Sequence, residues 1–410
     1  MTEGQLVCLA YSGGLDTSAI VPWLRETYHA RVLCYCSNIG QGDQELVGLE
    51  EKAVKSGAIG CVVEDVRERF VNEIVFPTLK AGAIYARTYL LGTSMARPIQ
   101  ASGQVRAALE AGATALAHGC TGKGNDQVRF ELAYMAEAPQ LKIIAPWREW
   151  KFRGREDLIA YLKEKKIPVQ VSPAKPWSRD RNLWHISHEG GILEDPAMPP
   201  PRDLFMLTKD PADAPNQPDE ITIEFDQGTP VAVDAVPLGG VKLIERLNEV
   251  AGLHGVGRAD VVEDRTVGMK SRGVYETPGG TVLRAAHREL EQIVLDRRTL
   301  ALKDSLAPRY ADLVYEGRWL TPERYALDAL VNVTQQRVTG TVRVRLFKGN
   351  VTPLSRKSPF SLYSEALATF SKDEVYNQAD AGGFIKLFGL PVRMTAQQAK
   401  KAAEAEVEGD

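Results

Sequence analysis

Apolar runs of strand length alternate with helical patterns over roughly the first 168 residues of the chain. These runs predict strands at Leu6–Ala10, Arg31–Ser37, Ala58–Glu64, Ala113–His118 and Leu141–Ala145. Helical patterns lie between them, for example over Gln127–Ala136 and Val105–Ala111. Strands that alternate with helices in this way are typical of a parallel sheet covered by helices on both faces. We therefore predict an α/β fold for this part of the chain.

The regular alternation stops near Ile167-Pro168, and the pattern beyond it is mixed. It predicts a strand at Glu220–Phe225, an amphipathic helix at Lys242–Val250, a long helix at Thr281–Leu302 and a hairpin at Val338–Val351. Such a mixture is typical of an α+β domain. The last residues, from Thr395, are rich in Ala, Lys and Glu and bury little alone, so we expect a helical tail that is frayed or packed on another subunit. The chain thus divides into three predicted domains, 1–168, 169–362 and 363–410.

Composition and charge narrow the class of protein. The chain of 410 residues has a net charge of −3, which argues against a nucleic-acid partner because such proteins carry a strong basic excess. An apolar stretch of about 18 residues, as a membrane span needs, is lacking, and the first residues lack the basic region of a signal peptide. The five cysteines show no second pair at zinc-site spacing. We expect a cytoplasmic protein with reduced thiols and no membrane partner.

The stretch Ser12–Ser18 carries the first chemical signal. A Gly-Gly pair between a strand and a helix start leaves backbone N–H groups free for an anion, and three hydroxyl side chains add donors. The stretch resembles the SGGxD[ST][ST] loop of the ATP pyrophosphatase (PP-loop) enzymes, which hold the pyrophosphate of ATP. A Walker A loop is excluded because Ala117 stands where its first glycine should be and Gly124 follows Lys123. An ordinary helix cap is the alternative, but a cap needs only one such residue.

Further polar stretches follow along the chain. Gly119–Glu131 places Asn125 and Arg129 four residues apart, on one helix face, where a guanidinium suits a carboxylate ligand. A capped surface helix with solvated charges is the alternative interpretation. The stretch Tyr85–Pro98 gives a weaker signal, and its pattern looks wrong for a plain helix because Gly92, Thr93 and Pro98 break it. Ser172–Asp195 has the aromatic and hydroxyl mixture of a substrate loop, and its two histidines lack a third metal ligand.

Five motifs taken together extend this interpretation over nearly the whole chain, from Leu6 to about Arg393: YSGGLDTS, YLLGTSMARP, HGCTGKGNDQVRFE, PWSRDRNLWHIS and NEVAGLHGVGRADVVEDRTVGMKSRGVYETP. They resemble the argininosuccinate synthase family. The resemblance implies the ATP-dependent condensation of citrulline with aspartate in arginine biosynthesis, through a citrullyl-AMP intermediate. It also implies Mg²⁺ bound through ATP, with no metal ligands assigned to the protein, and a homotetramer. The resemblance further implies that residues 1–168 form a nucleotide-binding domain, residues 169–362 a synthetase domain and residues 363–410 an oligomerisation arm.

Matching the family motifs residue by residue implies the site. ATP contacts are expected from Ala10, Tyr11, Ser12, Gly13, Gly14, Leu15, Asp16, Thr17, Ser18, Ser37 and Gly119. Aspartate contacts are expected from Thr121, Asn125 and Asp126. Citrulline contacts are expected from Tyr89, Ser94, Asn125, Arg129, Ser178, Ser187, Glu263 and Tyr275. One departure is Asp264, where the family often has Asn.

The chemistry assigns roles to three of these residues. Ser12 would stabilise charge on the departing pyrophosphate, and Asp16 would orient the loop or bind the metal through water. Asp126 would orient the attacking amine, while the identity of the general base stays open. Two other functions remain as alternatives: a tRNA-modifying PP-loop synthetase, which would need a basic surface, and a non-catalytic nucleotide sensor, which would need only the first half of the chain.

Overall fold

The computed structural model describes residues 4–167, 177–369 and 375–408. Contacts divide the chain into two compact units, residues 1–360 and 361–410, and each is described by itself. The predicted domain boundary between residues 168 and 169 lies outside the described residues. The division into three domains therefore stays a prediction.

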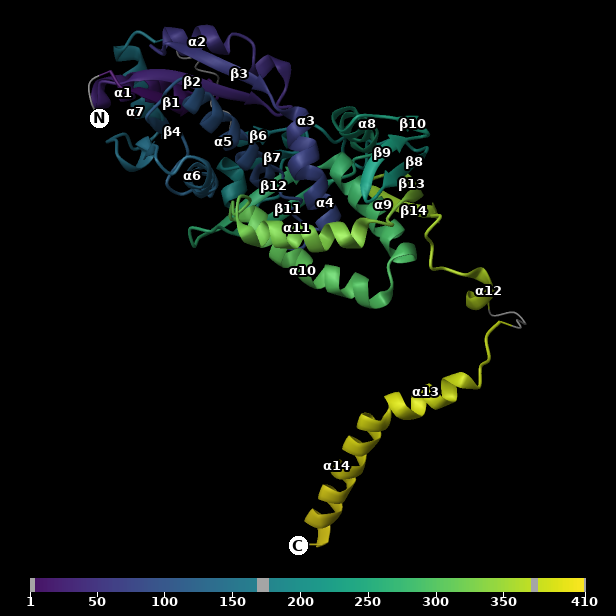
Figure 1. The fold of residues 1–410 in the computed structure, drawn as a ribbon. Helices are drawn as coiled ribbons and strands as arrows, with labels where there is room; N and C mark the ends of the chain where they lie inside the picture. Colours follow the sequence, from purple (N-terminus) through teal and green to yellow (C-terminus); the bar gives the residue numbers. More distant parts are fainter. Residues whose placement is uncertain (1–3, 168–176, 370–374, 409–410) are drawn as a thin grey trace. The chain divides into compact units, whose positions relative to one another are not determined.

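A five-stranded parallel sheet with strand order β3-β2-β1-β4-β5 forms the N-terminal half of the first unit. Its strands are β1 (Leu6–Ala10), β2 (Arg31–Asn38), β3 (Gly60–Asp65), β4 (Ala115–Ala117) and β5 (Lys142–Ile144). Its helices are α1 (Leu15–Tyr28), α2 (Leu49–Lys55), α5 (Gly92–Glu110), α6 (Asp126–Glu137) and α7 (Arg155–Glu164). Figure 1 shows α2 above the first three strands and α5 and α6 below them. The predicted parallel sheet with helices on both faces is confirmed.

Alternation along β1 explains why helices cover both faces. Val7 and Leu9 point to one side and pack in a core with Ile20 of α1. Leu6 and Cys8 point to the other side and pack against α5 and α6. All four side chains are nearly or fully inaccessible to solvent, which is typical of a central parallel strand.

Helix α5 is longer than the sequence pattern predicts. The pattern predicts a helix only over Val105–Ala111 and interprets Gly92 and Pro98 as breaks, but the helix begins at Gly92 and runs through Pro98. Leu91 precedes it in the left-handed conformation, with φ of 61°. Most of the helix is buried between the sheet and its neighbours, and this packing outweighs the weak local propensity.

The helical stretch between β3 and α5 connects the two halves. It consists of α3 (Arg67–Arg69), a π-helical turn at Phe70–Val75 and α4 (Phe76–Ala81). Its apolar side chains belong to the largest core of the molecule, together with those of α8 to α11. The segment that carries Tyr85 and Tyr89 follows α4 and leads back to the sheet.

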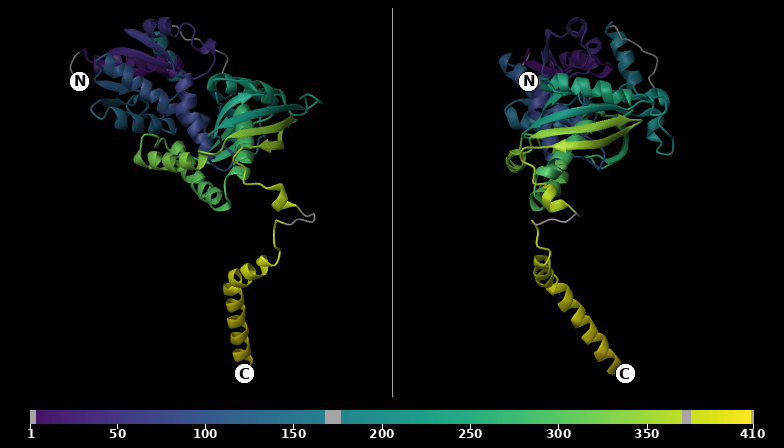
Figure 2. Two further views of the ribbon diagram at one scale, coloured as in Figure 1. Left: turned by 45° about the vertical axis from the view of Figure 1, so that its right-hand side comes forward. Right: turned by 90° about the vertical axis from the view of Figure 1, so that its right-hand side faces the viewer.

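The C-terminal half of the first unit contains two antiparallel sheets, with strand orders β10-β9-β8-β13-β14 and β11-β12-β7-β6. The strands are β6 (Ser178–Arg181), β7 (Ile186–Glu189), β8 (Asp219–Asp226), β9 (Thr229–Val233), β10 (Val236–Pro237), β11 (Arg258–Asp264), β12 (Lys270–Glu276), β13 (Gly340–Phe347) and β14 (Asn350–Lys357). The helices are α8 (Gly240–Leu253), α9 (Pro278–Val294), α10 (Arg297–Tyr315) and α11 (Pro322–Gln335). The right-hand view of Figure 2 shows strands of the larger sheet side by side. This mixture confirms the predicted α+β half.

Two predicted elements in this half differ from the structure. The predicted long helix Thr281–Leu302 is two helices, α9 and α10, because the chain turns at Leu295-Asp296. The Asp296 side chain accepts hydrogen bonds from the backbone N–H groups of Arg298 and Thr299 and so starts a new helix. The described part of the predicted substrate loop, from Trp177 onward, contains the strand pair β6 and β7 rather than irregular chain alone.

A buried carboxylate anchors the irregular chain near residues 206–208. Glu276 of β12 is fully buried and accepts hydrogen bonds from the backbone N–H groups of Met206, Leu207 and Thr208, at 2.7–2.8 Å. His188 of β7 pairs with the same carboxyl group at 2.9 Å. Burial alone would raise the pKa of Glu276, but these hydrogen bonds lower it. His188 therefore has a structural contact with a buried carboxylate.

The second unit consists of α12 (Glu365–Ala368), α13 (Asp380–Phe388) and α14 (Leu390–Glu408). These helices agree with the predicted helical tail. Several large apolar side chains of α13 are exposed, namely Phe384, Ile385, Leu387 and Phe388. Over the described residues, none of the helices is both long and apolar enough to cross a membrane.

Candidate active site

The carboxyl ends of β1, β2 and β4 lie side by side because β1 is central between the other two. In an open parallel sheet, ligands bind beyond these ends. A cavity of about 610 Å³ lies there and extends to β6 and β7. The predicted residues on its wall are Ala10, Tyr11, Ser12, Asp16, Thr17, Ser37, Gly119, Thr121, Asp126, Ser178 and Ser187.

The glycine loop joins β1 to α1 with local hydrogen bonds. The Ser12 hydroxyl lies 3.3 Å from the Thr17 hydroxyl and accepts from the backbone N–H of Gly14 at 3.3 Å. Gly14 precedes α1 without a side-chain cap, so the first N–H groups of the helix lack partners within it. Gly13 has φ of 69°, and a Cβ there would come within 2.4 Å of Leu49 Cδ2. The loop therefore requires glycine at this position and presents donors suited to phosphate.

Two charged side chains flank this loop. Asp16, in the first turn of α1, is partly buried, and burial raises its pKa although Arg155 opposes the effect. Lys52 of α2 donates a hydrogen bond to the carbonyl oxygen of Gly13. The sequence motif itself contains no lysine, so this contact comes from another element.

A second, smaller cavity of about 80 Å³ adjoins the first. Of the predicted residues, it is lined by Tyr89, Asn125, Asp126, Arg129, Glu263 and Tyr275. Thr93, Gly124, Asp126, Glu189 and Arg265 line both cavities, so the two share a wall. Charged side chains of both signs meet at this wall, namely Asp126 of α6, Glu189 of β7 and Arg265 of the β11–β12 hairpin, and α5 contributes Thr93.

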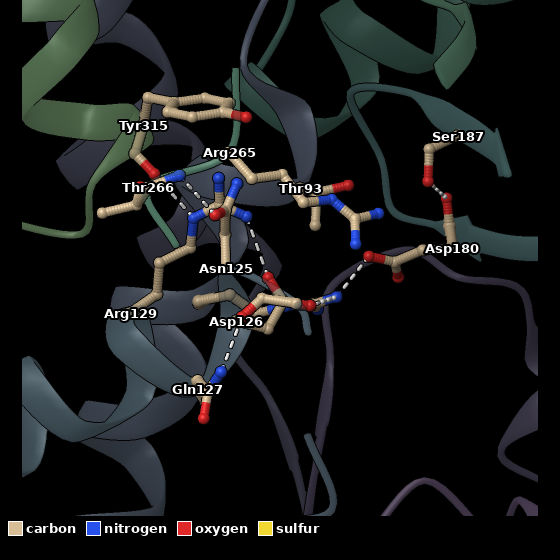
Figure 3. Close-up of polar contacts among 12 residues, drawn as sticks. Thr93, Asn125, Asp126, Gln127, Arg129, Asp180, Ser187, Arg265, Thr266 and Tyr315 are labelled. Carbon is tan, nitrogen blue, oxygen red and sulfur yellow. Dashed lines mark hydrogen bonds and ion pairs between the residues drawn. The ribbon is translucent and has the colours of Figure 1, made fainter. Parts of the chain in front are cut away.

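Asp126 is the centre of the charges on the shared wall. Its carboxylate contacts Arg97 of α5 at 2.9 Å and Arg129 of its own helix at 2.9 Å. Burial alone would raise its pKa, but the two guanidinium groups outweigh burial and lower it to about 2. Figure 3 shows Asp126 between Arg129 and Asp180, and Asp180 also pairs with Arg97. The Asp126 carboxylate is thus ionised at any physiological pH.

Glu263 is the second buried carboxylate of the small cavity. Its two oxygens accept hydrogen bonds from the phenols of Tyr275 and of Tyr315, the latter at 2.7 Å. Burial raises the pKa of Glu263 to about 7, and the Tyr315 hydrogen bond opposes this rise. A substrate ammonium group beside it would favour the ionised form.

Some predicted residues lie away from both cavities. Gly13, Leu15 and Ser18 are not on either wall, and Gly14 lines an adjoining cavity together with Ser178. Ser18 is buried, with its hydroxyl 3.3 Å from that of Tyr11. Ser94 is fully buried within α5, and its hydroxyl has no hydrogen-bond partner among the described residues. The structure therefore does not bring Ser94 to the site surface.

Comparison with known proteins gives the family. The family model described as the arginosuccinate synthase N-terminal HUP domain matches residues 6–168, and the model of the C-terminal domain matches residues 177–395. The chain belongs to the argininosuccinate synthase family. It is 59% identical over 391 residues to an argininosuccinate synthase of Roseiflexus sp. (strain RS-1). The aligned residues cover 95% of this chain and 96% of the relative.

Two further relatives carry the same name. One, from Pelotomaculum thermopropionicum, is 59% identical over 97% of this chain and 98% of its own length. The other, a chloroplastic protein of Arabidopsis thaliana, is 55% identical over 96% of this chain and 80% of its own. Among solved structures, a U34-tRNA thiolase from Methanococcus maripaludis matches 42% of this chain at 16% identity, with a TM-score of 0.29. That likeness is too slight to carry an argument.

Sequence reasoning did not assign to the candidate site several residues that line the two cavities or, in the case of Tyr315, contact a lining residue. They are Thr93, Arg97, Asp180, Glu189, Arg265 and Tyr315. Arg97, Asp180 and Arg265 stand inside quoted motifs, so a charged residue within a matched motif was the available signal. Tyr315 stands in no motif, and only the fold brings it to Glu263.

Proposed function

We propose that this chain condenses L-citrulline with L-aspartate, using ATP, and releases argininosuccinate, AMP and pyrophosphate. Membership of the argininosuccinate synthase family supports this reaction. The observation that carries the proposal is the shared wall of the two cavities, where Asp126, Glu189 and Arg265 face both spaces. The reaction needs an activated ureido group and an amine to meet, and adjoining cavities hold two reactants at short range.

The first step transfers AMP to citrulline. The ureido oxygen attacks the α-phosphorus of ATP, the bond from that phosphorus to the β-phosphate oxygen breaks, and pyrophosphate leaves with the electron pair. The glycine loop supports this step because Ser12 and Thr17 line the cavity beside β1, and because the first N–H groups of α1 lack partners within the helix. Donors already in place stabilise the charge that develops on the leaving group.

The second step joins the two amino acids. The amine of aspartate attacks the ureido carbon, the bond from that carbon to the AMP oxygen breaks, and the amine loses a proton. Asp126 would orient this amine, with Thr121 and Asn125 beside it on the cavity walls. In the small cavity, Arg129 would pair with the citrulline carboxylate and Glu263 with its ammonium group.

Mg²⁺ belongs to this proposal as the ion that accompanies ATP. It prefers phosphate and carboxylate oxygens and keeps several waters. Asp16, a partly desolvated carboxylate on the wall of the larger cavity, fits such an ion through water. When bound, the ion would neutralise charge on the triphosphate. The described residues contain no cluster of three or more His, Cys, Asp or Glu side chains arranged to hold a metal.

Omission of single substrates tests the reaction. The purified chain is given ATP labelled in the γ-phosphate with Mg²⁺, and the label is followed with citrulline, aspartate or both. We expect labelled pyrophosphate that depends on citrulline, and argininosuccinate only when aspartate is also present. Release that depends on tRNA would favour a tRNA-modifying synthetase. Free orthophosphate, or no release at all, would contradict the proposal.

A homotetramer in the cytoplasm, without a nucleic-acid partner, completes the proposal. Four large apolar side chains of α13 are exposed, which supports a contact of this helix with another copy. Deletion of Thr395–Asp410 should weaken the assembly, and light scattering would measure its mass. An unchanged mass would remove α14 from the proposed contact.

A further inference from the structure

Tyr315 lies at the C-terminal end of α10 and contacts two residues of the small cavity. Its hydroxyl donates to Glu263 Oε2 at 2.7 Å. Its backbone carbonyl accepts from Arg129 Nε at 2.8 Å, and the Arg129 guanidinium carbon lies 5.0 Å from the centre of its ring. Tyr315 therefore contacts two oppositely charged side chains that line the cavity, Glu263 and Arg129.

The end of α10 has a defined geometry that places Tyr315. The N–H of Gly317 donates to the carbonyl of Val314, and the N–H of Arg318 donates to that of Leu313, which is a Schellman motif. Gly317 has φ of 80°, and a Cβ there would come within 2.6 Å of Arg129 Cα. The helix thus ends in tight contact with α6, and its free last-turn carbonyl meets the guanidinium.

Aromatic packing holds the ring of Tyr315. The ring of Tyr85 stacks on it with centroids 3.6 Å apart and planes 4° apart. Tyr315 is 2% exposed, so its hydroxyl has little access to water. A buried phenol that donates to a carboxylate stabilises the charged form of that carboxylate.

The groups that face Glu263 oppose one another. Arg129 of α6 and Arg265 beyond β11 favour its charged form, while Glu189 of β7 and burial disfavour it. The phenols near it are those of Tyr85, Tyr89, Tyr275 and Tyr315. The balance gives Glu263 a pKa of about 7, so the loss of one donor changes its charge near neutral pH.

We propose that Tyr315 is a positioning residue for citrulline. Its hydroxyl orients the Glu263 carboxylate and its backbone carbonyl orients the Arg129 guanidinium, and both of these side chains line the small cavity. This inference rests on the proposed function and adds to it a residue of α10 that no motif contains. Tyr315 acts through Glu263 and Arg129 and does not line the cavity itself.

The variant Tyr315→Phe tests the hydroxyl alone, because the ring, its stack and the carbonyl remain. We expect the citrulline KM to rise about tenfold near pH 7, as the loss of a hydrogen bond to a charged group implies. The KM for ATP should change less than about twofold, since the loop at β1 is untouched. The acid limb of kcat/KM for citrulline should move up by about one pH unit, because the Glu263 pKa rises without its donor.

Tyr310→Phe is the matched control on the same helix. The Tyr310 hydroxyl donates to Asp328 at 2.7 Å, and Tyr310 lines neither cavity. This variant should keep the wild-type citrulline KM and pH profile. An unchanged profile in Tyr315→Phe, or an equal shift in Tyr310→Phe, would overturn the inference while the reaction itself stands. A wild-type chain without citrulline-dependent pyrophosphate release would instead overturn the proposed function.

Discussion

The two cavities of the site are built in different ways. At the glycine loop the larger cavity is lined by Ser12, Asp16 and Thr17, which come from one continuous stretch. This stretch offers hydroxyls and the uncapped N–H groups of α1. The small cavity is lined by side chains from α5, α6, β7, β11 and β12 and from segments next to them, and most of these are charged or phenolic. Tyr315 of α10 contacts two of them. A phosphate can be held by local backbone geometry, whereas a zwitterion needs opposite charges at a fixed separation. The first kind of site is encoded locally and the second requires the complete fold.

The largest effect is expected at the wall that the two cavities share. Asp126→Asn removes the carboxylate that contacts Arg97 and Arg129 and that would orient the attacking amine, so turnover should fall roughly a thousandfold. Argininosuccinate formation at saturating substrates measures it. Asp180 also pairs with Arg97, and the variant Asp180→Asn should lose less turnover than Asp126→Asn. Full turnover with an unchanged aspartate dependence would refute the role of Asp126.

A backbone change in the glycine loop should affect the use of ATP and not the use of citrulline. Gly13→Ala places a methyl group against Leu49 in a left-handed conformation, so kcat/KM for ATP should fall about a hundredfold as the donors shift. The citrulline KM at saturating ATP should stay the same. Gly48→Ala is the control, because Gly48 has a similar φ of 73° and nothing within 4 Å of a Cβ. Equal losses in both variants would show a general effect on folding.

A change of pH should affect the use of citrulline, which we place in the small cavity, and not the use of ATP. Glu263 has a pKa of about 7, and its ionised form is the one that binds an ammonium group. The value of kcat/KM for citrulline should therefore fall about tenfold for each pH unit below 7, while the dependence on ATP stays nearly flat. In Glu263→Gln the side chain does not titrate, so this acid limb of the pH profile of kcat/KM for citrulline should disappear. A limb that persists in this variant would belong to another group.

The smallest effect is expected at the far end of α10. Asp296 caps this helix, so Asp296→Ala should cost about 1 kcal/mol of stability and lower Tm by about 2 °C. Thermal unfolding measures this, and Asp296→Asn, which retains a capping oxygen, should recover most of it. The citrulline KM should not change, because the contacts of Tyr315 lie at the other end of the helix. A shift in the citrulline KM would mean that the geometry of the small cavity depends on the whole length of α10.

Local patterns predicted the parts of the fold that depend on neighbours in sequence. The alternation of strands and helices predicted the parallel sheet, and the hairpin turn at Lys348-Gly349 is present between β13 and β14. Local patterns failed where packing decides, as at Pro98 within α5 and at Asp296 between α9 and α10. In the first case burial outweighed weak propensity, and in the second a side-chain cap started a new helix within a stretch whose pattern predicts one long helix.

The amino-acid sequence by itself determined the glycine loop and the sheet edge on which it lies. Each depends on residues a few positions apart and on the rule that parallel strands end together. Only the tertiary structure decided which charges meet. Arg129 and Tyr315 are 186 positions apart, and Lys52 reaches a loop carbonyl 39 positions away. The pKa of Glu263 depends on burial and on groups from other elements, and no local pattern carries that information.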